Sequence, residues 1–134
     1  MKRWEAKRVV VLGIARQGKA LARYLASAGA WVVMSDIRSK NQLESAIAEL
    51  ADLDLTYVLG EHPPELLDGT HALFLSGGVP AQLPIVLEAR RREIPVLNDA
   101  QIFLEQCPAP VIGITGSAGK TTTTSLVYEM VKLG

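Results

Sequence analysis

The sequence is poor in the residues that mark several large classes of protein. Cys107 is the only cysteine among 134 residues, so no internal disulfide can form. Two tryptophans, three tyrosines and two phenylalanines offer few of the aromatic platforms that single-stranded nucleic acids stack on. The 14 basic and 14 acidic side chains cancel, which leaves no basic surplus for a duplex. The sequence therefore predicts no nucleic-acid partner.

Long hydrophobic runs are also missing. The longest, such as "VVVLGIA" at 9–15, are too short to span a bilayer. The N-terminus "MKRWEAKR" is polar and leads directly into a predicted strand, unlike a signal peptide. With the lone thiol, these features lead us to expect a cytoplasmic protein that does not bind membranes.

Apolar runs that alternate with helical patterns are what the sequence does have. Capping-box spacings at Asn41–Glu44 and Asn98–Gln101 predict two helix starts, and Gly29 predicts a helix end. Such alternation is typical of an α/β fold, a Rossmann-like parallel sheet with helices on both faces. Strands are predicted at 8–14, 31–36, 55–59, 71–76, 95–98 and 110–115, and helices at about 16–28, 41–51, 85–92, 98–107 and 120–133.

Prolines at 108 and 110 interrupt the chain before the last predicted strand. We place a domain boundary there, between residues 1–107 and residues 108–134. Because ligands of parallel sheets bind at the carboxyl ends of the strands, we look for functional residues just after the strands.

The first strand is followed by "GIARQG" at 13–18. Gly13 and Gly18 fit the outer glycines of a dinucleotide fingerprint, but Ala15 replaces the middle one. The backbone N–H groups of 15–18 still open a helix N-terminus, which favours an anion. The alternative is a tight turn that binds no ligand.

Asp36 ends the second strand, 23 residues after Gly13. An acidic residue at about this distance holds a ribose in dinucleotide folds, so a nucleoside suits this position. Arg38 could stack on a base. The alternative is that Asp36 only caps a turn.

The fourth strand is followed by "SGGVP" at 76–80. Adjacent glycines let backbone N–H groups converge on an anion, and Ser76 adds a hydroxyl. The alternative is a flexible turn.

The last predicted strand leads into "GITGSAGKTTTT" at 113–124, a shortened phosphate-binding loop with the core G-x-x-G-K-T. A strand before and a helix after are the context that this motif requires. Backbone N–H groups of 116–121 can surround phosphates, Lys120 can reach the β- and γ-phosphates, and Thr121 can offer its hydroxyl to Mg²⁺.

The remaining candidates have simpler interpretations. His62 and His71 have no second histidine or cysteine at metal-ligand spacing, so we expect both to be structural. Cys107 suits a buried small hydrophobe. The arginines at 90–92 end a helix, where cations are favoured.

Taken together, these segments resemble the Mur ligases of peptidoglycan synthesis, most closely the D-glutamate-adding branch. The segments that carry the resemblance are "GIARQG", "VVMSD", "LSGGVP", "NDAQIF" and, most specifically, "VIGITGSAGKTTTT". That family has a UDP-binding domain, a central ATP-binding domain and a third domain for the amino acid. The resemblance implies that this chain holds the first domain and a truncated start of the second: one strand, the phosphate loop and a helix.

The resemblance also implies ligands and roles. The substrates would be UDP-N-acetylmuramoyl-L-alanine and D-glutamate, with ATP and Mg²⁺ as cofactors; ATP would phosphorylate the alanyl carboxylate, and the D-glutamate amine would displace phosphate. Lys120 and Thr121 would be the catalytic pair, with Thr121 also on Mg²⁺. The ATP loop would comprise Gly116, Ser117, Ala118, Gly119, Lys120, Thr121 and Thr122; the substrate site would comprise Ala15, Arg16, Asp36, Ile37, Arg38, Ser76, Gly77 and Gly78.

Two positions depart from the family pattern. Ala118 stands where many members have asparagine, and Ile37 stands where some have a hydroxyl residue, which removes two possible side-chain contacts. We expect residues 1–134 alone to be inactive. We also expect the apolar stretch 110–133 either to mediate self-association or to fray while residues 1–107 stay folded. Alternatives are a sister Mur ligase that adds another amino acid, or a non-catalytic nucleotide-binding Rossmann module.

Overall fold

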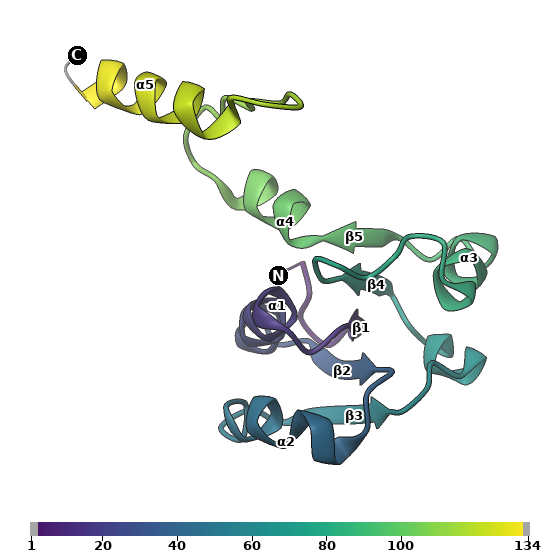
Figure 1. The fold of residues 1–134 in the computed structure, drawn as a ribbon. Coiled ribbons are helices and arrows are strands. Elements are labelled where there is room, and N and C mark those ends of the chain that lie inside the picture. Colours follow the sequence, from purple (N-terminus) through teal and green to yellow (C-terminus); the bar gives the residue numbers. More distant parts are fainter. Residues whose placement is uncertain (1–2, 133–134) are drawn as a thin grey trace. The chain divides into compact units, whose positions relative to one another are not determined.

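The computed structural model describes residues 3–132, which form two compact units, one up to Phe103 and one from Leu104 onward (Figure 1). No helix within the described residues is both long enough and apolar enough to cross a membrane.

A five-stranded parallel sheet forms the centre of the first unit. Its spatial order is β3-β2-β1-β4-β5. The chain therefore runs outward in one direction through three strands and then returns to the other side of β1, which makes the β1–β4 boundary a topological switch point. The strands are β1 (Arg8–Leu12), β2 (Trp31–Asp36), β3 (Leu55–Leu59), β4 (Ala72–Leu75) and β5 (Val96–Asn98).

Helices cover both faces of this sheet (Figure 1). Because side chains alternate along a strand, Val9 and Val11 of β1 pack with Leu25 of α1, whereas Val10 packs with Val86 of α3. The predicted parallel sheet with helices on both faces is thus confirmed. The helices are α1 (Arg16–Ser27), α2 (Lys40–Ala48), α3 (Pro84–Arg91) and α4 (Asp99–Gln106), with a 3₁₀ turn η1 (Pro64–Leu67).

The two predicted helix starts have different outcomes. At α4, Asn98 and Gln101 bond reciprocally: each side-chain oxygen accepts the other's backbone N–H, at 2.9 and 3.0 Å, as predicted. At α2 the prediction is wrong by two residues. Ser39 is the N-cap, with extended backbone, and its N–H donates to Gln42 Oε1 at 2.9 Å. Asn41 already lies inside the first turn and cannot cap it.

The second unit contains α5 (Lys120–Lys132), which matches the predicted last helix. The strand predicted at 110–115 does not form within the described part of the chain. A strand needs a neighbour to satisfy its backbone N–H and C=O groups, and no other described segment pairs with this one. Val111 and Ile112 are consequently exposed, Ile112 to 72%.

Candidate functional site

A cavity of about 340 Å³ lies at the carboxyl ends of the strands in the first unit. Three of the predicted strand-end segments, those after β1, β2 and β4, contribute to it. Arg16, also predicted, is exposed and lies outside the lining set. The lining residues are Gly13, Ala15, Asp36, Ile37, Arg38, His62, Ser76, Gly77, Gly78, Val79, Pro80 and Leu83.

The turn after β1 depends on its two glycines. Gly13 has φ +89°, a left-handed conformation that side chains rarely adopt. A Cβ on Gly18 would lie 1.9 Å from the Gly13 carbonyl oxygen, so α1 can approach the strand end only with glycine there. Ala15 is the N-cap of α1 and provides no side-chain cap. The first N–H groups of α1 therefore lack a side-chain acceptor and suit an anion.

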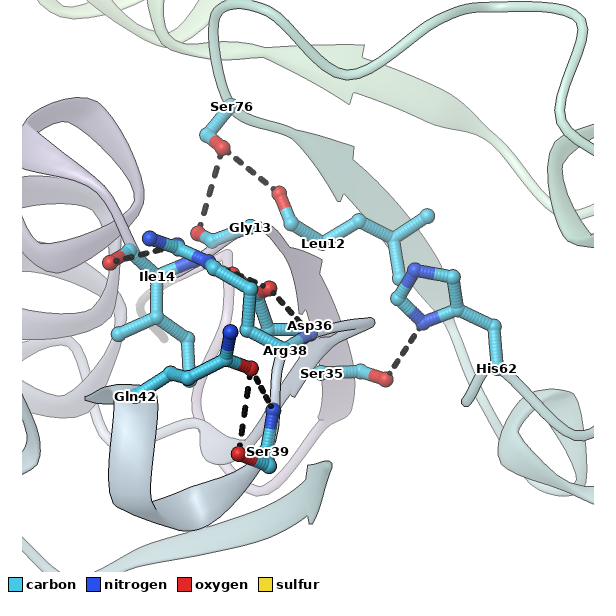
Figure 2. A network of polar contacts seen from close by, with 10 residues as sticks. All are labelled: Leu12, Gly13, Ile14, Ser35, Asp36, Arg38, Ser39, Gln42, His62 and Ser76. Carbon is cyan, nitrogen blue, oxygen red and sulfur yellow. Dashed lines mark hydrogen bonds and ion pairs between the residues drawn. The ribbon is translucent and has the colours of Figure 1, made fainter. Parts of the chain in front are cut away.

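Asp36 has all of its acceptor positions occupied by groups of the chain (Figure 2). Oδ2 accepts Ile14 N–H at 2.8 Å and Arg38 Nη2 at 2.7 Å. Oδ1 accepts Arg38 N–H and Nε, both at 3.0 Å. Four donors match the roughly four lone-pair sites of a carboxylate. Asp36 thus holds the β1 turn and the Arg38 side chain in fixed positions.

The protonation state of Asp36 follows from these contacts. Burial raises its pKa, because only 5% of the residue is exposed, but the hydrogen bonds from Arg38 and Ile14 outweigh burial and lower the pKa to about 2. The carboxylate is therefore charged at neutral pH. Arg38 neutralises it and is itself about half exposed at the cavity, with 45% of its side chain accessible.

Ser76 joins the β4 loop to the β1 turn. Its buried hydroxyl donates to Leu12 O at 2.8 Å and faces Gly13 O at 3.2 Å (Figure 2). Next to it, Gly77 leaves room for the Gln17 side chain, because a Cβ would lie 1.8 Å from Gln17 Oε1. Gly78 has φ +88° and open space around it. The two glycine-containing turns are therefore fastened to each other at the switch point.

Sequence reasoning missed His62, which was predicted to be structural but lines the cavity. Its Nδ1 lies 2.8 Å from the hydroxyl of Ser35, a fully buried residue of β2 (Figure 2). Burial lowers the pKa of His62, although the charge of Asp36 partly opposes this, so the ring is neutral at pH 7. The available signal was position: His62 follows the end of β3, and the search of strand ends omitted that strand.

The predicted phosphate loop, residues 116–122, belongs to the second unit. The Thr123 N–H bonds to Gly119 O at 2.9 Å as the first bond of α5. The preceding N–H groups of Lys120, Thr121 and Thr122 therefore have no partner in the helix. The Lys120 ammonium turns back to Gly116 O at 2.5 Å. These three N–H groups and the ammonium can donate hydrogen bonds to a phosphate, and the Thr121 hydroxyl oxygen can ligate a cation.

Among residues 3–132, no three histidine, cysteine, aspartate or glutamate side chains lie together as a metal site would require. A cation at the phosphate loop would need oxygen ligands from Thr121 and from the phosphates themselves.

A family model and curated relatives resemble this chain along most of its length. Residues 7–98 match the family model described as "Mur ligase MurD-like, N-terminal domain". The chain is 40% identical over 126 residues to a UDP-N-acetylmuramoylalanine–D-glutamate ligase of Geobacter sp. strain M21, which covers 94% of this chain and 28% of the relative. It is also 40% identical over 132 residues to the protein of that name from Streptococcus mutans, covering 98% and 29%. The chain thus spans less than a third of these relatives.

Solved structures agree on the fold. A pseudomurein peptide ligase type C from Methanothermus fervidus is 27% identical with a TM-score of 0.56, over 95% of this chain and 26% of that one. A UDP-N-acetylmuramate–alanine ligase from Thermotoga maritima gives a TM-score of 0.57 at 24% identity, over 93% and 29%. At that identity the second likeness supports the fold alone.

Proposed function

The chain belongs to the Mur ligase family through its MurD-like N-terminal domain, and we propose that it forms the UDP-binding part of a ligase that adds D-glutamate to UDP-N-acetylmuramoyl-L-alanine. The observation that carries this proposal is the cavity, in which three nucleotide-compatible strand ends meet at one switch point. Relatives at 40% identity that are named for this reaction support the choice of substrate.

Within this proposal, the two glycine-containing turns hold the pyrophosphate. The donors are the N–H of the N-cap Ala15, the first N–H of α1 at Arg16, and the backbone N–H groups of Gly77 and Gly78. The hydrogen bond from Ser76 to Leu12 fixes the spacing of the two turns. The positive end of α1 adds an attraction of about 0.3–1 kcal/mol for an anion at an exposed site.

The uridine lies toward the end of β2. Asp36 already accepts four hydrogen bonds, so we assign it the role of holding Arg38 and the β1 turn in place. Arg38 offers its planar guanidinium to the nucleoside, and Ile37, 65% exposed, offers an apolar surface.

Residues 108–134 form the start of an ATP-binding domain in this proposal, with residues 1–107 as the substrate domain. The N–H groups of Gly116–Thr122 hold the phosphates, Lys120 leaves Gly116 O to neutralise them, and Thr121 contributes its hydroxyl to Mg²⁺. ATP, when bound, supplies the phosphoryl group that turns the substrate's carboxylate into an electrophile. The protein itself positions the phosphates and balances their negative charge.

Calorimetric titration of residues 1–134 with UDP and with NAD tests the proposal. We expect UDP to bind and NAD to bind more weakly, because Ala15 replaces the glycine that lets a dinucleotide approach closely. The Asp36→Ala variant should bind UDP more weakly than the parent, since it releases Ile14 and Arg38. No detectable UDP binding, or a preference for NAD, would overturn the proposal; equal UDP binding by variant and parent would overturn the role of Asp36.

A further inference from the structure

Few polar side-chain atoms in the cavity remain free to contact a ligand. Four of the lining residues have polar side chains: Asp36, Arg38, His62 and Ser76. Asp36 accepts four donors, and the Ser76 proton faces two backbone carbonyls. Among these described lining residues, the side-chain nitrogens without a hydrogen bond are Arg38 Nη1 and His62 Nε2. The guanidinium of Arg38 is paired with Asp36, whereas the His62 ring is neutral and is anchored through its other nitrogen, Nδ1.

The contact with Ser35 sets which nitrogen of His62 carries the proton. Within the described residues, the Ser35 hydroxyl lies 2.8 Å from Nδ1 of His62 and 3.5 Å from the carbonyl oxygen of Glu61. O–H···O bonds are normally 2.5–3.0 Å long, so the contact with Glu61 O is too long for a good hydrogen bond. The Ser35 hydroxyl therefore donates its proton to Nδ1 of His62. Nδ1 is then the acceptor, and in a neutral imidazole the ring proton must sit on Nε2.

Resting on the proposed function, we infer that His62 is a specificity-determining residue that donates its Nε2–H to a carbonyl oxygen of the ligand's pyrimidine base. Ser35 acts as a positioning residue that selects this tautomer. The surroundings suit a flat, partly apolar ring, because Val79, Pro80 and Leu83 line the same cavity. The base is thereby recognised through a neutral donor, and the nearby charged carboxylate stays paired with Arg38.

The chain contains two histidines, which provides a matched control. His62→Phe keeps a flat ring of similar size and removes the donor. His71→Phe makes the same change at an exposed site outside the cavity lining. One neutral hydrogen bond corresponds to about a 3- to 10-fold change in affinity. We expect His62→Phe to weaken UDP binding by that factor and His71→Phe to leave it unchanged.

Nitrogen NMR of the parent protein gives a second readout that does not depend on a variant folding. With ¹⁵N-labelled histidine, the Nε2 signal of His62 should be of the protonated type and should shift on addition of UDP, while the His71 signals stay in place. Ser35→Ala should reduce the protonated Nε2 population of His62.

The outcomes separate the two claims. If the parent binds UDP but His62→Phe binds it equally well, or the His62 Nε2 is unprotonated or unmoved in the complex, the inference about His62 is wrong and the proposed function stands. If the parent does not bind UDP, the proposed function and the inference both fall.

Discussion

Replacing Asp36 with asparagine removes the charge from a nearly buried carboxylate while preserving its shape. The amide can accept through only one of its two heavy atoms, so either Ile14 N–H or the Arg38 guanidinium loses its acceptor. A pKa lowered from 3.8 to about 2 corresponds to roughly 2 kcal/mol of stability. Solvent around the half-exposed Arg38 screens part of this, which leaves about 1–2 kcal/mol. The donor that is left without an acceptor adds to this cost. We therefore expect the free energy of unfolding to fall by about 2–3 kcal/mol in total at pH 7.

The loss should depend on pH in a defined direction. Because the folded protein binds this proton less tightly than the unfolded chain does, the stabilisation is present above about pH 4 and is lost as the pH falls toward 2. The difference in unfolding free energy between parent and Asp36→Asn should therefore be largest near neutral pH. It should shrink steadily between about pH 4 and pH 2, the interval between the unfolded and folded pKa values.

Urea titrations followed by tryptophan fluorescence suit this measurement, because both tryptophans lie in the first unit and Trp4 is packed edge-on against Phe74. Asp54→Asn, at an exposed carboxylate, is the control and should change stability by less than about 0.5 kcal/mol. A destabilisation that is equal at pH 7 and pH 2.5, or no destabilisation, would show that the charge of Asp36 does not support the β1 turn.

Three further predictions can each be checked by one measurement. Gly18→Ala places a Cβ 1.9 Å from the Gly13 carbonyl oxygen and should cost about 1–3 kcal/mol in a urea titration; a neutral effect would contradict the close approach of α1 to β1. Leu25→Ala, at a fully buried position, should cost about 2–5 kcal/mol, whereas Leu87→Ala, half exposed on α3, should cost less than about 1 kcal/mol. Light scattering should show association that increases with concentration through residues 110–133; a monomer at every concentration would refute it.

Sequence periodicity was sufficient for the centre of the sheet because β1, β2 and β4 are largely buried on both faces. β2 and β3 form over the predicted residues, because a short and mostly apolar run bounded by turn residues is typical of a strand in a parallel sheet. The same reasoning failed at 110–115, where the run is equally apolar but no strand pairs with it. The apolar pattern indicates which side chains a segment can bury. A strand also needs a neighbouring strand that satisfies its backbone hydrogen bonds.

The site was only partly predictable for a related reason. The glycines at 13, 18, 77 and 78 could be found because strand ends and local backbone requirements are visible in sequence. His62 also follows a strand end, that of β3, but its place in the cavity depends on more than its position in the sequence. It reaches the cavity because η1 packs Leu66 and Leu67 against the face of the sheet that α3 covers, and that packing is tertiary.

The hydrogen bond from Ser76 to Leu12 couples the two glycine-containing turns, so that they keep a fixed spacing and move together. A ligand that bridges them does not have to order one turn after binding to the other, so little conformational entropy is lost on association. Mutations in the two turns should also fail to add, because loosening either one already frees the other. Sequence change at 13–18 is therefore constrained by the residue at 76, and neither turn can be varied independently of its neighbour across the switch point.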